Sequence, residues 1–294
     1  MGSSLRSFAP EDRAAVLELS RHALQKPQEQ VGNPLWTTAE ELESELSDWE
    51  VAPEETLFVD EIDGVVVGFA GVEISPGFDH ADLFGPLVAP SHRGQKLGTV
   101  LLEAAIERAE NRSARRLVGA VGTRNGTGRL LLERAGFMPS GSATAVFRLT
   151  ENDHRRVETA PAELTVRPGA PEDIEGTMRL YRECFPDGSF PETAWLRGLE
   201  QGSVFIGEVD GEMRGVVHID APDRWIYHVG VSEGERDRGI GAYVLSEALA
   251  TYWSNHPRET LGLSVRADNL PALRLYRRQG FAPMLVLQAF ELPL

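Results

Sequence analysis

The chain has 294 residues, one cysteine and a formal net charge of -16 at pH 7, and this length is enough for two domains that each bury a core. The acidic balance excludes a nucleic-acid-binding surface built from clustered Lys and Arg, and the lone Cys184 excludes an internal disulfide or a thiolate metal cluster. No stretch is apolar enough to span a membrane and residues 1–10 do not form a secretory signal, so we expect a cytoplasmic protein with no membrane partner.

The first predicted element is a helix that begins at residues 9–12, Ala-Pro-Glu-Asp, and the same four residues recur at 170–173. Pro followed by acids favours a helix start, because it leaves no orphan N–H and suits the helix dipole. In each half a strand ending in Asp-Gly then predicts a hairpin turn to a second strand. These strands are predicted at 57–64 and 65–74, and again at 204–211 and 213–220.

Both halves continue in the same order, with an apolar strand, a glycine-containing loop, a long helix, a strand, a helix ending in Gly-Phe and a last strand. A repeat of this length predicts two tandem α/β (α+β) domains, each with a mixed, mostly antiparallel sheet flanked by helices. The polar segment with Pro161 is interpreted as the linker between them. The predicted boundaries are 1–150 for the N-terminal domain, 151–163 for the linker and 164–294 for the C-terminal domain.

The loop that follows strand 226–231 is predicted to bind an anion. It carries Arg236, Arg238, Gly239 and Gly241 and runs directly into a helix, whose free N–H groups and dipole attract phosphate while glycines let it approach. A dinucleotide-binding loop would need a third glycine and a P-loop would need Gly-Lys, so neither motif fits. Taken alone, the glycine pair could equally be a tight turn that packs the helix on the sheet.

Two motifs together resemble the GCN5-related N-acetyltransferase (GNAT) family. Arg236-x-x-Gly239-x-Gly241 resembles its pyrophosphate-binding motif, and Asn269-x-x-Ala272-x-x-Leu275-Tyr276-x-x-x-Gly280-Phe281 is similar to its second signature helix. The resemblance implies acetyl-CoA as cosubstrate, lying in a gap between the parallel strands 226–231 and 260–266, with a bulge in the first. It implies that the N–H of Val229 polarises the thioester carbonyl, that Val231 pairs with the pantetheine amides and that Asn269, in the motif with Ala272, contacts the pantetheine arm. The pyrophosphate would be held by the amides of Arg236, Asp237, Arg238, Gly239, Ile240, Gly241 and Ala242.

Tyr276 is the candidate acid that protonates the departing coenzyme A thiolate. Outside this motif, a Tyr at such a helix position would be interpreted as a core residue. A base is needed because a free amine is mostly protonated at neutral pH. His228 is the first candidate, since the unperturbed pKa of histidine suits the task. Tyr227, His218, Asp220 or a water chain remain alternatives, and each of these side chains could instead have a packing role. Cys184 has no histidine partner in its surroundings and is predicted to be a packing residue, and the seven histidines show no metal-ligand spacing.

The first half departs from the motifs at two positions. Lys96 stands where the second half has Gly239, and Leu132 stands in place of Tyr276. Because leucine cannot donate a proton, we expect a degenerate N-terminal domain that shapes or supports the protein, with the active site in the C-terminal domain.

The leading interpretation is an enzyme that moves an acetyl group from acetyl-CoA to a primary amine of a small molecule or peptide by direct attack, because no convincing nucleophile is present. The alternative is a non-catalytic acyl-CoA-binding or regulatory protein, and a scaffold that binds no coenzyme is a third possibility. The chain could be a monomer or a homodimer. A cationic acceptor is suggested by acids and aromatics in the segments 180–199 and 219–225, namely Phe185, Asp187, Phe190, Trp195, Asp220, Asp223 and Trp225.

Overall fold

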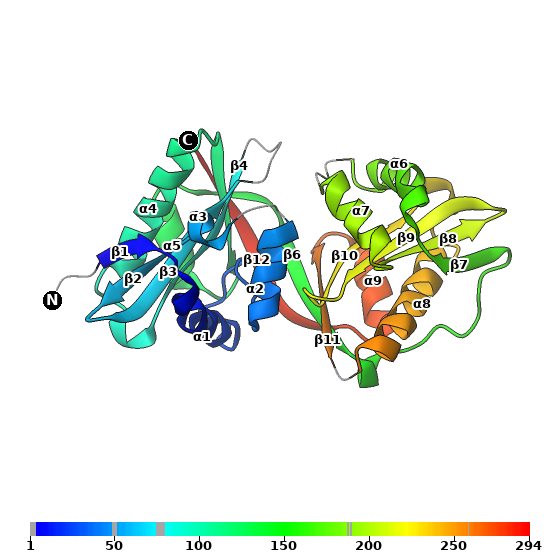
Figure 1. The fold of residues 1–294 in the computed structure, drawn as a ribbon, viewed down its shortest axis with the longest axis horizontal. Helices are drawn as coiled ribbons and strands as arrows, with labels where there is room; N and C mark the ends of the chain where they lie inside the picture. Colours follow the sequence, from blue (N-terminus) through cyan, green and yellow to red (C-terminus); the bar gives the residue numbers. More distant parts are fainter. Residues whose placement is uncertain (1–3, 49–51, 75–79, 187, 189, 258) are drawn as a thin grey trace. The chain divides into compact units, whose positions relative to one another are not determined.

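The computed structural model describes residues 4–48, 52–74, 80–186, 188, 190–257 and 259–294 (Figure 1). The chain forms two compact units. Unit 1 contains residues 1–145, 266–268 and 285–294, and unit 2 contains residues 146–265 and 269–284. Within the described residues, no helix combines the length and the hydropathy that a membrane crossing requires.

The first repeat forms its elements in the predicted order. The Asp63-Gly64 turn has positive φ angles of 51° and 80°, as a hairpin turn that matches strand twist requires. The elements are β1 (Ser4–Ser7), α1 (Arg13–Leu24), α2 (Ala39–Asp48), α3 (Pro53–Thr56), β2 (Leu57–Ile62), β3 (Val65–Glu73), β4 (His80–Val88), α4 (Leu97–Asn111), β5 (Arg116–Gly122), α5 (Gly126–Arg134) and β6 (Met138–Thr150).

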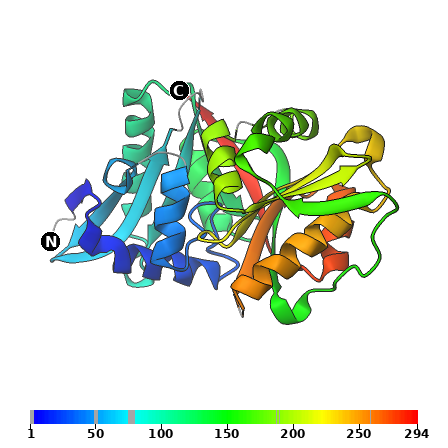
Figure 2. The ribbon, with the colours of Figure 1, turned by 45° about the vertical axis from the view of Figure 1, so that its right-hand side comes forward.

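Unit 1 is built on a sheet with the strand order β1-β2-β3-β4-β5-β12-β6. The pairs from β1 to β4 are antiparallel, β4 and β5 are parallel, and β5 pairs antiparallel with residues 287–293. Helix α1 packs on one face of the sheet and α4 on the other (Figures 1 and 2). The core between them includes Trp36, Phe69 and Phe84, which are fully buried.

The second repeat follows the same order. Its hairpin turn, Asp210-Gly211, has φ angles of 53° and 77°, which repeats the conformation of the first turn. The elements are β7 (Leu164–Pro168), α6 (Ile174–Cys184), α7 (Glu192–Glu200), β8 (Val204–Val209), β9 (Glu212–Asp220), β10 (Trp225–Val231), α8 (Ile240–Asn255), β11 (Thr260–Arg266), α9 (Leu270–Gln279) and β12 (Ala282–Pro293).

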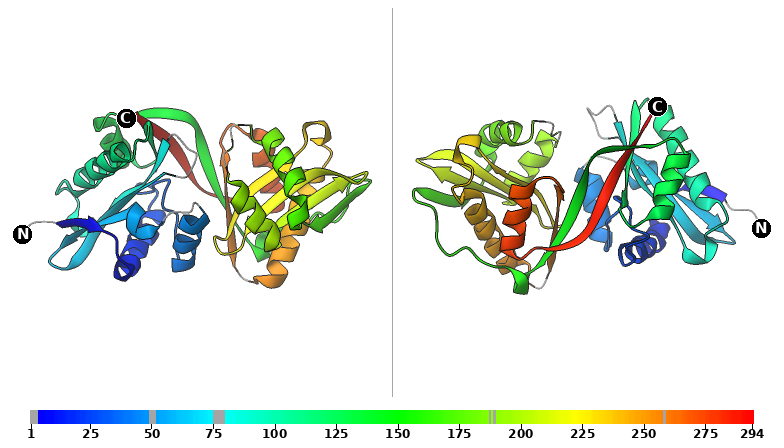
Figure 3. Two further views of the ribbon diagram at one scale, coloured as in Figure 1. Left: turned by 45° about the horizontal axis from the view of Figure 1, so that its top comes forward. Right: turned by 180° about the vertical axis from the view of Figure 1, so that it is seen from behind.

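In unit 2 the strand order is β6-β11-β10-β9-β8-β7. Antiparallel pairs run from β7 to β10, and β10 and β11 are parallel. Helices α6 and α7 cover one face of this sheet, and α8 and α9 cover the other (Figures 1 and 3). The predicted mixed, mostly antiparallel sheets flanked by helices are therefore confirmed in both repeats.

The same ion-pair network anchors the first helix of each repeat. Arg6 donates to both carboxylate oxygens of Asp12 at 2.6 and 2.8 Å and to Glu61 at 2.8 Å, and Asp12 accepts from the N–H of Ala9 at 2.8 Å. Hydrogen bonds from Arg6 lower the pKa of Asp12. The second repeat reproduces these contacts with Arg167, Asp173, Glu208 and Ala170. Each aspartate therefore ties the helix start to a strand of its own sheet.

The two glycines that end the signature helices provide a matched stability test. Gly136 and Gly280 both have left-handed backbones, with φ of 92° and 102°. A Cβ on Gly280 would overlap the carbonyl oxygen of Asp153, whereas one on Gly136 would meet only Leu292, at 3.4 Å. We expect Gly136→Ala to lower the unfolding free energy by about 1 kcal/mol through left-handed strain alone, and Gly280→Ala by about 3 kcal/mol because a backbone contact is added. Urea unfolding of both variants measures the difference, and equal losses would contradict the close approach of Asp153.

Candidate active site

Two parallel strands diverge in the middle of unit 2. The pairing of β10 with β11 covers Trp225 with Gly262 and Ile226 with Leu263, and continues no further along the described strands. On its other side β10 shifts register against β9 between Ile226 and His228, so the predicted bulge is confirmed. The divergence leaves one edge of β10 without a strand partner beyond Ile226.

Strand alternation decides which backbone groups face this gap. The N–H of Ser232 donates to the carbonyl of Arg214, at 2.9 Å, on the β9 side. Because backbone groups of successive residues point to opposite edges of a strand, those of Val229 and Val231 point toward the gap. The carbonyl of Val231 indeed accepts from Arg236 Nε at 3.3 Å and Cys184 Sγ at 3.4 Å rather than from β9. The predicted oxyanion contact and the predicted pantetheine contact therefore lie on the same edge.

The loop after β10 leads directly into the N-terminus of α8. Gly239 caps the helix with a left-handed φ of 85°, and Asp237 before it also has a positive φ, of 62°. Ile240 is buried at 2 % exposure and anchors the first turn on the sheet. Gly241 approaches Val231 so closely that a Cβ would stand 3.0 Å from its side chain. The helix N-terminus thus faces the end of the gap with its N–H groups, which is a geometry suited to phosphate.

The guanidinium groups of this loop have partners within unit 2. Arg236 donates to the carbonyl of Val231, and Arg238 forms an ion pair with Glu235. Both arginines are exposed. Asn269 has a local role, because its side chain accepts from the N–H of Ala272 at 3.2 Å and caps α9. Capping places Asn269 at the start of α9 and does not by itself test a contact with a ligand.

Tyr276 lies on the buried face of α9. It is 7 % exposed and packs edge-on against Phe281, with the ring centroids 5.7 Å apart. Burial raises the pKa of its phenol, so the hydroxyl keeps its proton across the physiological pH range. A neutral phenol is the form that can donate a proton to a thiolate.

His228 projects from the bulge into a cluster of aromatic side chains on the α6 and α7 side of the sheet. Its ring centroid lies 4.8 Å from those of Phe190 and Trp195 and 5.1 Å from that of Tyr181. His218 stacks on it at 6.1 Å. Burial, and then the charge of His218, lower the pKa of His228 well below the ordinary value, and burial lowers the pKa of His218 to about 4. Both imidazoles are therefore neutral at pH 7.

The acidic and aromatic residues expected near the acceptor are partly brought together. Tyr227 donates to the carboxylate of Asp223, whose N–H donates to Asp220 at 2.8 Å, and burial raises the pKa of Asp220. Phe185 joins the cluster, with its ring centroid 5.2 Å from that of His228. Trp225 instead stacks under the guanidinium of Arg148, at 5.1 Å. Asp187 lies outside the described residues.

Cys184 packs beside Gly230, and burial raises the pKa of its thiol. The thiol form is a poor nucleophile. Across the described part of the chain, no three His, Cys, Asp or Glu side chains are arranged to hold a metal ion.

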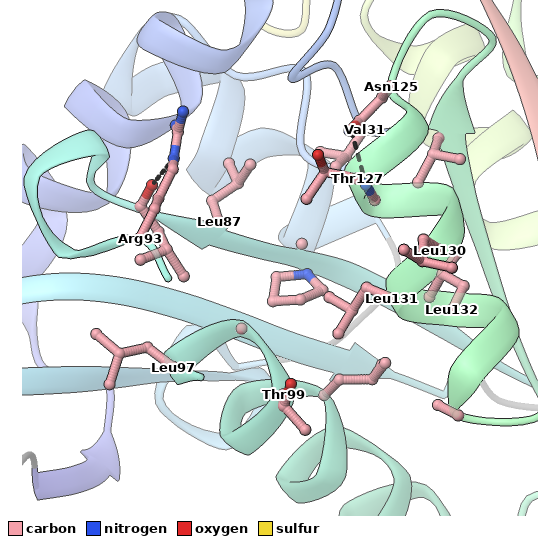
Figure 4. A pocket seen from close by; sticks show the side chains of 18 of the residues that line it. Val31, Leu87, Arg93, Leu97, Thr99, Asn125, Thr127, Leu130, Leu131 and Leu132 are labelled. Carbon is pink, nitrogen blue, oxygen red and sulfur yellow. Dashed lines mark hydrogen bonds between the residues drawn. The ribbon is translucent and has the colours of Figure 1, made fainter. Parts of the chain in front are cut away.

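Unit 1 has the same gap and an open pocket beside it. Strand β4 pairs with β5 at His80, Ala81 and Asp82 and then diverges. A pocket of about 990 Å³ lies between α4 and α5 and extends to the loop before α4. Figure 4 shows Thr99 of α4 and Leu131 of α5 among the side chains that line this space.

The loop of unit 1 keeps the conformation of its counterpart despite the lysine. Lys96 caps α4 with a left-handed φ of 65°, as Gly239 caps α8. Arg93 donates to Glu29 at 2.7 and 2.9 Å and to the carbonyl of Val88 at 3.0 Å. The hydrogen bonds from Arg93 lower the pKa of Glu29. Lys96 therefore leaves the shape of the anion-binding turn intact and places its side chain at the pocket.

The gap of unit 1 differs from that of unit 2 at the position that corresponds to Val229. Pro86 stands seven residues before Arg93, as Val229 stands seven before Arg236, and proline has no N–H to donate. The segment 30–33 also hydrogen-bonds to both diverging strands, through Gly122 N–H, Gly32 N–H and Gly85 N–H at 2.7 to 2.8 Å. Sequence reasoning missed Pro86, although counting back from the arginine would have found it.

Comparison with known proteins decides the family. A model described as the acetyltransferase (GNAT) family matches residues 19–137 and 174–281, which is more than half of the chain. The chain belongs to the GNAT family. Each repeat carries one match, so the two repeats are two GNAT domains in tandem.

Individual GNAT relatives are distant. The chain is 26 % identical to a mycothiol acetyltransferase of Clavibacter sepedonicus over 220 residues, which are 66 % of this chain and 67 % of that protein. It is 25 % identical to an N-alpha-acetyltransferase of Sulfurisphaera tokodaii over 44 % of this chain and 86 % of the relative. A GCN5-related N-acetyltransferase from Sphaerobacter thermophilus has a similar structure, with a TM-score of 0.81, 23 % identity and coverage of 99 % and 95 % of the two chains. A tandem GNAT protein from the clavulanic acid biosynthesis pathway gives a TM-score of 0.75 at 17 % identity, over 99 % and 98 %.

Burial of His218 makes the stability of this GNAT protein depend on pH. The pKa of His218 is about 4 in the folded chain and 6.5 as a reference value, so the unfolded state binds more protons between these values. We expect the unfolding free energy to fall by about 3 kcal/mol on account of this residue as the pH drops from 6.5 to 4. Urea unfolding across this range, beside His218→Phe, measures the effect. An unchanged pH dependence in the variant would contradict the buried neutral imidazole.

Proposed function

We propose that the chain is an acetyl-CoA-dependent N-acetyltransferase that acts on a primary amine of a small molecule or peptide, with the chemical step in unit 2. The observation that carries the proposal is one shared edge in unit 2. There Val229 and Val231 face the gap between β10 and β11, and the left-handed turn at Gly239 presents the N-terminus of α8. The coenzyme would place its pyrophosphate at that turn and its thioester beside Val229.

Within this proposal the amine attacks the thioester carbonyl directly. A nitrogen–carbon bond forms, the carbon–sulfur bond breaks, and the N–H of Val229 stabilises the developing oxyanion. Tyr276, which burial keeps protonated, donates its proton to the departing sulfur. The neutral imidazole of His228 takes the proton that the amine loses and passes it to solvent, because its lowered pKa disfavours the imidazolium. The products are the acetylated amine and the free thiol of coenzyme A, and the phenolate of Tyr276 regains a proton from solvent, so atoms and charges balance.

The acceptor class follows from the side chains near His228. Aromatic rings surround the imidazole, and the Asp223 carboxylate lies close by, in a hydrogen bond with Tyr227. Aromatic faces and a carboxylate both favour a positively charged group. We infer that the acceptor is a cationic amine, which the site binds as the ammonium ion and which loses one proton to solvent before the free amine attacks.

A second candidate function is supported by unit 1. Its pocket of about 990 Å³ is large enough for a coenzyme, yet Pro86 offers no N–H and Leu132 offers no proton. A binding module that senses acyl-CoA without turning it over would have these features. On this alternative the whole chain would be a coenzyme-binding or regulatory protein.

Three variants separate these possibilities. We expect Gly239→Glu to abolish acetyl transfer, because a carboxylate at the turn repels the pyrophosphate, and Tyr276→Phe to lower kcat by roughly 10²-fold or more. The matched change Lys96→Glu in unit 1 should leave transfer intact. Lys96 itself holds the left-handed position, so a side chain there is compatible with the fold. Thiol release from acetyl-CoA, measured over a panel of primary amines and peptide N-termini, gives the rates.

The contradicting results are equally specific. Transfer that survives Gly239→Glu but is lost with Lys96→Glu would place the chemistry in unit 1. Coenzyme binding without thiol release for any amine would favour the non-catalytic alternative. Absence of coenzyme binding in calorimetry would contradict both.

A further inference from the structure

The segment that joins the two repeats packs closely on the signature helices of unit 2. After the short 3₁₀ turn Glu151–Asp153, the N–H of Arg155 donates to the carbonyl of Gln279, the last residue of α9, at 2.9 Å. Two residues later, the N–H of Val157 donates to Ser246 Oγ of α8 at 2.8 Å. The segment therefore crosses from α9 to α8, and Figure 3 shows it passing both helices on the way to β7.

The same segment continues to the predicted phosphate-binding turn. Arg156 forms an ion pair with Glu247 of α8 at 3.1 Å. Farther along, the ring of Pro161 lies 3.6 Å from the place where a Cβ on Gly239 would stand. Residues 153–161, which we name the strap, thus run from the end of α9 to the turn that begins α8.

Comparison of the two repeats shows what the strap covers. In unit 1 the positions that correspond to two of its contacts line the open pocket between α4 and α5: Glu103 and Ala135 correspond to Ser246 and Gln279. Glu103 is exposed and Ala135 is half-buried, whereas Ser246 is 0 % and Gln279 1 % exposed. Gln279 also donates across the helices to the carbonyl of Ala242 at 2.8 Å. Surfaces that face a pocket in unit 1 are therefore covered by the chain itself in unit 2.

We propose that the strap is an internal occupant of the coenzyme groove in unit 2, so that acyl-CoA binds there only when the strap is displaced. The inference rests on the proposed function, because it assumes that this groove takes the coenzyme. Unit 1 has an open groove but lacks counterparts of the Val229 N–H and the Tyr276 hydroxyl. Unit 2 has both groups, and the strap covers its groove. The strap makes the coenzyme affinity of unit 2 depend on an equilibrium between a covered and an open groove.

The contacts suit a cover that can leave. The hydrogen bonds from the N–H groups of Arg155 and Val157 and the exposed Arg156–Glu247 ion pair each contribute modestly to stability. A coenzyme that brings a pyrophosphate to the start of α8 makes several charge-assisted hydrogen bonds in return. A ligand that binds only the open form has its apparent affinity reduced by the fraction of molecules that are open.

Reversal of the Arg156–Glu247 pair provides the test. Acetyl-CoA is titrated by calorimetry into the full chain carrying Lys96→Glu, a change expected to block coenzyme binding at the turn of unit 1. In this background we expect Arg156→Glu to tighten binding to unit 2 by about tenfold, because two carboxylates now repel and the strap opens. The double change Arg156→Glu with Glu247→Arg restores the pair and should return binding to the starting value. Arg179→Glu, an exposed change of the same charge on α6, is the control.

The sign of the effect makes the result decisive. A new carboxylate near the phosphates would by itself weaken binding of an anionic ligand, so a gain that the double change reverses supports the strap. Val157→Pro, which removes the N–H that binds Ser246, should give a similar gain without any change of charge. Equal binding in all variants would overturn the strap and leave the proposed function standing. No binding to unit 2 in any variant would overturn the strap together with the placement of the chemistry in unit 2.

Discussion

Backbone groups at the gap between two diverging parallel strands are the constraint on which the rest of this structure depends. Where β10 leaves β11 and β4 leaves β5, N–H and C=O groups lose their ladder partners, and buried groups of this kind need a partner. In unit 1 the segment 30–33 supplies several hydrogen bonds to the two strands. In unit 2 side chains of Arg236 and Cys184 contact the carbonyl of Val231. The N–H groups of Val229 and Val231 face the same edge, which is where we propose that the thioester and the pantetheine amides bind.

The gaps of the two repeats meet this constraint in different ways. In unit 1 the segment 30–33 bridges the gap, which leaves no room there for the reacting end of a coenzyme. The same unit has Pro86 and Leu132 at the positions of Val229 and Tyr276. A gap left to a ligand needs a proton donor and a phosphate-binding turn beside it. In unit 2 we propose Tyr276 and the turn at Gly239 for these roles. The strap then covers the groove at the signature helices, where unit 1 has its pocket.

Much of the fold could be predicted from local patterns in the sequence. Asp-Gly turns, Pro-Glu-Asp helix starts and Gly-Phe helix ends each act over a few residues, and β11 is found at the predicted residues, 260–266. The bulge in β10 was expected from the family resemblance and is confirmed. The strand that completes unit 1 was not foreseen. Residues 287–293 of the second repeat pair with β5 of the first, and an alternating apolar pattern predicts a strand without identifying its partner.

The site was predicted less completely, for the same physical reason. Residue types indicated Tyr276 and the turn at Gly239, but no local pattern in the polar segment 151–163 indicates that it packs on α8 and α9. The aromatic surroundings of His228 arise from α6, α7, β9 and β10 together. A lowered pKa from such burial depends on tertiary contacts that a sequence pattern does not contain. The open pocket of unit 1 also depends on tertiary packing, because among the described residues no segment fills the space between α4 and α5.

Amide hydrogen exchange with and without acetyl-CoA is the most direct test of the gap between β10 and β11 as the coenzyme site. If the thioester and pantetheine arm lie along this edge, exchange of the Val229 and Val231 amides should slow by about tenfold or more when the coenzyme is bound. Protection confined to residues 93–99 of unit 1, with no change at Val229 or Val231, would contradict the claim.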